Sequence, residues 1–313
     1  MGHITFVHGI ANKTDPDALL ETWRAGLIDN DGIDLDDLGV TVSMVYWADM
    51  LYAAPLPAGR AQESSELELA EAVAADAGDL GWLSDLPPDE RAFVTSFAKE
   101  VGLTAEALEQ RTTDAEAIAD ESVLESIPLP DWLKVRLMRA LLRDVHHYLY
   151  DVEFSPRPGE SFRIRRDLRA RALTVLQKGA ERPRPHVLVG HSLGSVIAYD
   201  MLAAVDETPA IDAFVTCGSP LGIDEVQQRL MPPWTRSDGW PSQRLLDGPW
   251  TNVYDTFDPV CGGWRAALAG HYQRGSVEKV ADLKVHNEGS WRHSIGKYLG
   301  QDGLRNALRD VLT

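Results

Sequence analysis

A serine between two glycines has the surroundings of a nucleophile. Ser192 is the middle residue of GHSLG, residues 190–194, which follows the apolar run HVLV of residues 186–189. That run is typical of a buried strand, and residues 194–199 begin a helical pattern, so the serine lies at a strand-to-helix junction. The glycines allow a tight turn that exposes the hydroxyl at the helix N-terminus, where partial positive charge would stabilise an oxyanion. We therefore predict that Ser192 is a nucleophile.

A serine hydroxyl needs a base to remove its proton, and the base needs an acid that orients it. At a junction of this kind the acid follows the serine along the chain, and the histidine follows the acid. Two acids, Asp255 and Asp258, end the strand predicted at residues 250–254. We predict that Asp258 is the acid because it lies further past the strand, in a loop that Pro259 constrains. Asp255 is the alternative.

The predicted base is His293, which lies in a loop just before the last predicted helix. Two other histidines come after the acids in the sequence. His286 lies at a strand end, where it can simply cap the strand, and His271 is the third option. The position of His293 before the last helix favours it over both.

Stabilisation of an oxyanion requires two backbone N–H groups beside the serine. Leu193, which follows the nucleophile, supplies one in this arrangement. The other is expected from the loop after the first strand, where the sequence reads FVHGI at residues 6–10. We predict that Ile10 supplies it.

Apolar segments typical of strands alternate with helical segments over most of the chain. The strands are predicted at residues 3–9, 40–47, 186–189, 213–217, 250–254 and about 280–285. Helices are predicted from about residue 15, at about 161–178, from 194 and from about 295 to 312. This alternation predicts an α/β fold with a mostly parallel sheet that is covered on both faces.

Residues 53–150 interrupt this alternation with helical periodicity and little strand signal. The segment is too long for a structureless loop. We predict that it is a helical cap inserted into an α/β core of residues 1–52 and 151–313. The cap is expected to reach over Ser192 and to provide apolar walls for an acyl chain. The candidate wall residues are Phe97, Trp132, Leu133 and Leu137.

Charge and composition exclude several classes of protein. The net charge of the 313 residues is −18, and residues 61–127 alone contain 17 acidic against 3 basic residues. A surface this acidic repels nucleic acid and anionic lipid. The acidic stretch is interpreted as a solvated helix face, with partner docking or substrate filtering as the alternative. No cluster of His, Cys and carboxylate residues has the spacing of metal ligands, so neither a metal nor a cofactor is expected.

The sequence also favours a cytoplasmic protein. Cys217 and Cys261 are the two cysteines of the chain and do not make a disulfide framework. The N-terminal residues lack the pattern of a signal peptide. No stretch reaches the roughly 18 apolar residues that a membrane helix requires, so no stable membrane insertion is expected.

Several of these segments resemble the lipase and esterase branch of the α/β-hydrolase superfamily. They are residues 6–10, 190–194 and 258–260 together with His293, and the GSPL turn at residues 218–221 recurs in lipase-like relatives. The segment GHSLGSVIAYD, residues 190–200, is also similar to the nucleophile region of DDHD-type intracellular phospholipases. The chain begins at what would be the third strand of the family. The resemblance therefore implies a sheet of about six strands without the usual first hairpin.

This resemblance implies a serine hydrolase that cleaves a small-molecule or lipid ester with Ser192, His293 and Asp258. Thioesters and amides are cleaved by the same groups, and fold analogy does not separate them, so both stay open as alternatives. An alternative of another class is a non-catalytic interaction protein on a hydrolase scaffold, with the acidic helical block docking a partner.

Overall fold

The structure is a computed structural model, and it describes residues 1–57, 80–103, 131–231, 234–241, 243–245, 247–288 and 291–313. A parallel sheet forms the centre of the fold. Its strands are β1 (Gly2–Val7), β2 (Val40–Val45), β5 (His186–His191), β6 (Ala213–Cys217), β7 (Trp250–Tyr254) and β10 (Val280–Lys284). The strand order is β10-β7-β6-β5-β1-β2, and every neighbouring pair is parallel. The predicted α/β fold with a six-stranded sheet and no antiparallel first hairpin is therefore confirmed.

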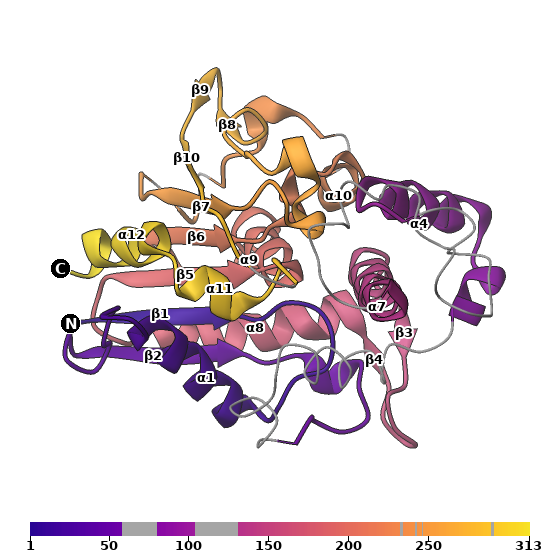
Figure 1. The fold of residues 1–313 in the computed structure, drawn as a ribbon, viewed down its shortest axis with the longest axis horizontal. Helices are drawn as coiled ribbons and strands as arrows, with labels where there is room; N and C mark the ends of the chain where they lie inside the picture. The colour runs from indigo at the N-terminus through magenta and orange to yellow at the C-terminus, as the bar shows by residue number, and fades with distance from the viewer. Residues whose placement is uncertain (58–79, 104–130, 232–233, 242, 246, 289–290) are drawn as a thin grey trace.

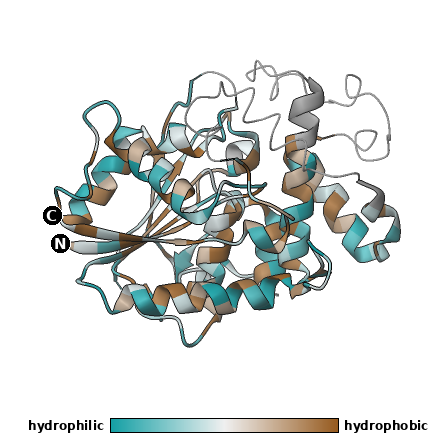
Figure 2. Ribbon diagram, turned by 90° about the horizontal axis from the view of Figure 1, so that it is seen from below, coloured by the Kyte–Doolittle hydropathy of each residue, from teal (hydrophilic) through white to brown (hydrophobic). Residues whose placement is uncertain are grey.

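Helices cover both faces of this sheet (Figure 1). On one face lie α1 (Pro16–Ile28), α11 (Ile295–Leu299) and α12 (Asp302–Leu312), whose apolar side chains share one buried cluster with the strands. On the other face lie α8 (Ile164–Ala180) and α9 (Leu193–Ala204), which contribute to a second cluster. Figure 2 shows hydrophobic and hydrophilic residues alternating along the helices, as expected of helices that bury one side.

The remaining described elements lie outside the two helical layers named above. The α-helices are α4 (Pro88–Glu100), α7 (Asp131–Leu149) and α10 (Asp224–Leu230). The 3₁₀ helices are η1 (Ala48–Met50), η2 (Leu80–Asp85), η3 (Pro220–Gly222), η4 (Arg236–Asp238), η5 (Pro259–Cys261) and η6 (Gly263–Arg265). Two small antiparallel hairpins pair β3 (Glu153–Phe154) with β4 (Phe162–Arg163) and β8 (Gln273–Arg274) with β9 (Val277–Glu278).

Two predicted helices differ from the observed ones. The last helix, predicted as continuous from about residue 295, is divided into α11 and α12. Gly300 ends α11 by donating its N–H to the carbonyl of Gly296, and Gln301 is extended before α12 begins. The helix predicted from residue 161 begins only at Ile164, because Phe162 pairs with Phe154 in the β3–β4 hairpin.

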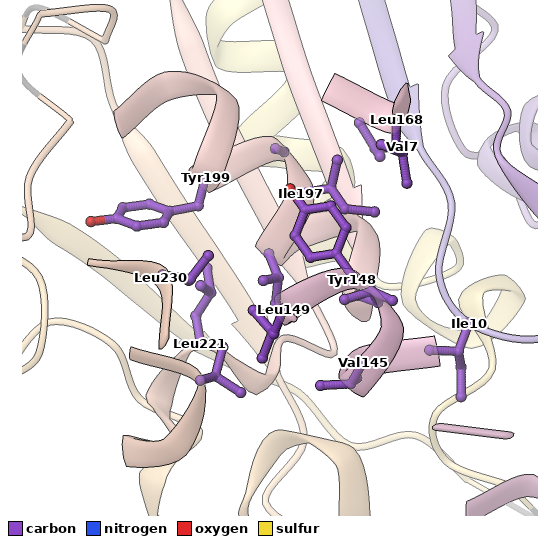
Figure 3. Close-up of a cluster of buried hydrophobic side chains, with 14 of the residues drawn as sticks. Val7, Ile10, Val145, Tyr148, Leu149, Leu168, Ile197, Tyr199, Leu221 and Leu230 are labelled. Atoms are coloured by element: carbon purple, nitrogen blue, oxygen red, sulfur yellow. The ribbon is translucent and has the colours of Figure 1, made fainter. Parts of the chain in front are cut away.

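Part of the predicted cap lies beyond the carboxyl ends of the strands. Figure 1 shows α4 and α7 past the tips of the arrows of β1 and β5. The described side chains of α7 pack into the same cluster as those of α8 and α9, and Figure 3 shows Tyr148 of α7 beside Ile197 of α9. Residues 58–79 and 104–130 lie outside the described residues, and most of the acidic stretch lies there with them. The division of the chain into core and cap stays a prediction.

Candidate active site

Ser192 occupies a strained turn between β5 and α9. Its backbone has φ 55° and ψ −132°, a conformation that a residue other than glycine keeps only where the surrounding structure holds it. The glycines beside it are required by close backbone contacts. A Cβ on Gly194 would lie 2.1 Å from the carbonyl oxygen of Val7, and one on Gly190 would lie 2.6 Å from the Cα of Ser195. The turn predicted from the sequence is therefore present, with the serine at the N-terminus of α9.

His293 and Asp258 meet in the interior at the same edge of the sheet. The Nδ1 of His293 lies 2.8 Å from Oδ2 of Asp258, and both side chains are buried. Oδ2 of Asp258 also accepts a hydrogen bond of 2.7 Å from the hydroxyl of Tyr298, and Oδ1 accepts one of 2.9 Å from the N–H of Val260. Burial alone would raise the pKa of Asp258, but His293 and these two donors lower it below its ordinary value. The carboxylate is therefore ionised at neutral pH.

Oγ of Ser192 and Nε2 of His293 are two of the buried side-chain atoms that have no hydrogen-bond partner among the described residues. Buried polar atoms are rarely left unpaired unless they serve a purpose. A serine hydroxyl and the free nitrogen of a histidine held by a carboxylate are the two atoms that exchange a proton in serine catalysis.

His191 holds His293 in place from the strand side. Its Nε2 lies 2.9 Å from the backbone carbonyl of His293, and the two rings pack with their centroids 4.7 Å apart. Because a carbonyl can only accept, Nε2 of His191 carries the hydrogen. Burial lowers the pKa of His191 well below its ordinary value, so its ring is neutral. A neutral neighbour does not compete with His293 for a proton.

The alternatives to the predicted acid and base lie elsewhere. Asp255 accepts hydrogen bonds from the N–H groups of Phe257 and Asn287 and forms an ion pair of 3.1 Å with Arg292. These bonds connect Asp255 to the loop that carries His293, but they do not include the imidazole. Asp258 rather than Asp255 is therefore brought to His293.

Neither alternative histidine reaches an acid in a comparable way. His286 is exposed, and its Nδ1 lies 3.2 Å from a guanidinium nitrogen of Arg292. His271 has its Nδ1 3.1 Å from Nε2 of Gln227. Among the described residues, neither histidine contacts Asp258.

The loop after β1 brings Ile10 close to the serine. A Cβ on Gly9 would lie 2.7 Å from the Cβ of Ser192, so the loop passes directly beside the nucleophile candidate. The next residue, Ala11, has φ 69° and donates its N–H to Oδ2 of Asp144 at 2.8 Å. Within the part of the chain that the structure describes, the N–H groups of Ile10 and Leu193 donate no hydrogen bond. Both predicted oxyanion donors are therefore available.

His8 and Trp47 fix the start of this loop. The N–H of Trp47 donates to Nε2 of His8 at 3.0 Å, and its indole N–H donates to the carbonyl of His8 at 2.9 Å. Nδ1 of His8 then donates to the carbonyl of Gly9 at 2.8 Å. Burial lowers the pKa of His8 well below its ordinary value, which keeps the ring in this neutral tautomer.

Sequence reasoning missed three residues that support the site: Trp47, Asp144 and Tyr298. Trp47 carries no signal in the sequence beyond its place after a strand. Tyr298 lies on α11 a few residues after His293, which is the only hint that its hydroxyl reaches Asp258. Asp144 is a buried acid on α7, and no pattern in the sequence marks it as a partner of the loop after β1.

A cavity of about 180 Å³ lies next to His293 at the mouth of the site. Leu137 of α7 lines it, in agreement with the prediction of an apolar wall. Phe97, another predicted wall residue, is instead fully buried in the apolar cluster and is absent from the lining. The side chains of Trp132 and Leu133 lie outside the described residues. The residues that line the cavity include Gly9, Ile10, Lys13, Trp23, His191 and Trp291.

The fold and this site together define a class of protein: a parallel α/β sheet with a serine at the turn after a central strand and a buried histidine–aspartate pair at the same edge. A family model described as the alpha/beta hydrolase family matches residues 127–304, which is more than half of the chain. The chain belongs to this family of hydrolases. No curated protein has a matching sequence, and the similarity to DDHD-type phospholipases stays a prediction.

None of the helices in the described ranges is long and apolar enough to cross a membrane.

Proposed function

We propose that this hydrolase cleaves carboxylic esters through a Ser192-His293-Asp258 triad and an acyl-enzyme intermediate. The observation that carries the proposal is the buried pair of His293 and Asp258 at 2.8 Å, which leaves Nε2 of the imidazole without a partner. The strained, buried serine with an unpaired hydroxyl supports it further.

Each group has a defined part in the reaction that we propose. Oγ of Ser192 attacks the carbonyl carbon while Nε2 of His293 takes the hydroxyl proton, and Asp258 stabilises the imidazolium that forms. The N–H groups of Ile10 and Leu193 bind the oxyanion of the tetrahedral intermediate. The intermediate collapses, and the alcohol leaves with the proton of His293. Water then attacks the acyl-enzyme with His293 as base, which releases the carboxylic acid and restores the serine.

The substitution Ser192→Ala tests this proposal. It removes the attacking oxygen with little change in volume, so the variant is expected to fold normally and to lose short-chain 4-nitrophenyl ester turnover by about 10³ or more. Ser161→Ala, at an exposed serine, is the matched control and is expected to retain full activity. If the Ser192 variant turns the ester over at the wild-type rate, the protein is not a serine hydrolase that uses Ser192. Thioesters and amides of the same acyl chain, assayed in parallel, decide between the three substrate classes.

We further propose that the protein works in a reducing compartment such as the cytoplasm. Both cysteines, Cys217 and Cys261, are free and buried, and burial raises the pKa of both thiols, which disfavours the reactive thiolate. Fractionation of cells that express the chain tests this, and recovery from an oxidising compartment would contradict it.

A further inference from the structure

One charged side chain lies in the wall of the cavity beside His293. The other described lining residues are apolar or uncharged, apart from the histidines. Lys13, which is half-buried, follows the loop that carries Ile10. Lys13 therefore places a cation in the wall of the cavity that His293 also lines.

Within the part of the chain that the structure describes, Lys13 forms no ion pair with a carboxylate. Its Nζ donates a hydrogen bond to the carbonyl of Ile10. Asp144 is the acid that influences it, yet the oxygens of Asp144 already accept from Ala11, Tyr52 and Arg143. An ammonium has three donors, so Lys13 keeps donors that no described protein group uses.

Burial of this cation needs an explanation. Burial lowers the pKa of Lys13 to about 8, so the side chain is still mostly protonated at neutral pH. A charge in an apolar wall costs free energy unless a counter-charge or several hydrogen bonds compensate it. The bond to Ile10 alone could be made by a neutral amide such as glutamine without that cost. A structural role in the loop therefore does not account for the charge.

The volume of the cavity limits the size of the molecule that can supply a negative charge to Lys13. A volume of about 180 Å³ is below the roughly 300–1,000 Å³ of pockets for drug-sized ligands. It fits a short acyl chain, and the apolar lining suits methylene groups. A single cation matches a single negative charge better than it matches a phosphate dianion.

We propose that Lys13 binds a terminal carboxylate on the acyl chain of the substrate, so that the preferred substrates are short monoesters of dicarboxylic acids. This inference rests on the proposed ester hydrolysis, because it concerns the specificity of the same site. Lys13 is a binding residue in this account and takes no part in the proton transfers.

A pair of esters with equal chain length tests the inference. The probes are 4-nitrophenyl hexanoate and mono-4-nitrophenyl adipate, which differ in the terminal carboxylate, with spontaneous hydrolysis subtracted. The wild type is expected to have the higher kcat/KM for the adipate ester. Lys13→Met keeps the length and loses the charge, and it should reduce the ratio of the two kcat/KM values by about tenfold to a hundredfold. Lys13→Arg should keep most of the ratio, and Lys284→Met, at an exposed lysine, should not change it.

Two outcomes would overturn the inference. If Lys13→Met lowers both rates equally, Lys13 acts only through the carbonyl of Ile10. If the wild type prefers the hexanoate ester, the cavity does not select for a carboxylate.

A binding measurement separates this inference from the proposed function. Free adipate should raise the Tm of the wild type more than its neutral diamide, adipamide, does, and Lys13→Met should abolish the difference. Binding of adipate that depends on Lys13, without any ester hydrolysis, would refute the proposed function and leave the carboxylate site standing. Hydrolysis that depends on Ser192, with no adipate effect and no selectivity, would refute the carboxylate site alone.

Discussion

The turn that carries Ser192 and the loop that carries Ile10 lie side by side at the carboxyl ends of β5 and β1, but different parts of the chain hold them. The carbonyl of Ser192 accepts a hydrogen bond of 2.9 Å from the N–H of Ser195, three residues later, and the flanking glycines allow the tight backbone. The loop after β1 is held by Asp144, which is 133 residues from Ala11 in the sequence. The N–H of Ser192 also donates to the carbonyl of Cys217 on β6. The nucleophile turn is thus held by its own residues and by neighbouring strands of the sheet, whereas the oxyanion loop depends on a helix of the predicted cap.

The largest effect is expected at the base of the triad. Among the histidines of the described residues, His293 alone combines a buried carboxylate partner with an unpaired Nε2. His293→Ala should therefore lower kcat/KM by about 10³ or more, as much as the loss of the serine. His286→Ala, at an exposed histidine, is the matched control and should cost little. The reverse order in an ester assay would show that the histidine has been assigned wrongly.

The acid should have the next largest effect. Asp258→Asn removes the charge that stabilises the imidazolium and the acceptor that fixes its tautomer, so kcat should fall by more than about 10². Asp255→Asn weakens only the ion pair with Arg292 and the loop contacts around it, and its loss of kcat should be clearly smaller. Equal losses in the two variants would mean that order in the loop, rather than contact with His293, determines the rate.

A moderate effect is expected at Asp144, and it bears directly on the comparison of the two loops. Asp144→Asn replaces a charged acceptor of the Ala11 N–H with a weaker neutral one, so kcat should fall about fivefold. The phosphonylation of Ser192 by a small fluorophosphonate, in which Oγ displaces fluoride from phosphorus, should slow in the same proportion, since both reactions need the oxyanion hole. Asp37→Asn, at an exposed aspartate, serves as the control. An unchanged kcat in the folded Asp144 variant would show that the oxyanion loop keeps its shape without the helix.

The smallest effect concerns pH. The pKa of Asp258 is lowered in the folded protein, so its stabilising contribution is present above the ordinary carboxyl pKa and is lost as the pH falls through the lowered value. Tyr298→Phe removes one donor to Asp258 and should raise that pKa, so the loss of stability on acidification should begin at a higher pH. Profiles of Tm against pH for this variant and for Tyr254→Phe test the expectation. If the Tm values of the two variants fall at the same pH on acidification, the hydrogen bond from Tyr298 does not influence the pKa of Asp258.

The contrast between the two loops also explains what the sequence could predict. The strands and the turn at Ser192 have sequence patterns that are visible within a few positions of the chain. The choice of Asp258 over Asp255 followed from position past the strand, and the contact with His293 agrees with it. Tyr298, Trp47 and Asp144 act across long separations, and a hydroxyl, an indole or a single carboxylate carries no local pattern that announces such contacts. The break between α11 and α12 is not predicted because the apolar stripe continues from one helix to the other. Gly300 is the one residue in the sequence that hints at it.

The most direct test of the account is labelling with a fluorophosphonate, followed by mass spectrometry of the peptides. The account predicts one adduct per chain on Oγ of Ser192, formed rapidly in the wild type, slowly in His293→Ala and not at all in Ser192→Ala. An unlabelled wild-type protein, or an adduct on another serine that persists in Ser192→Ala, would contradict it.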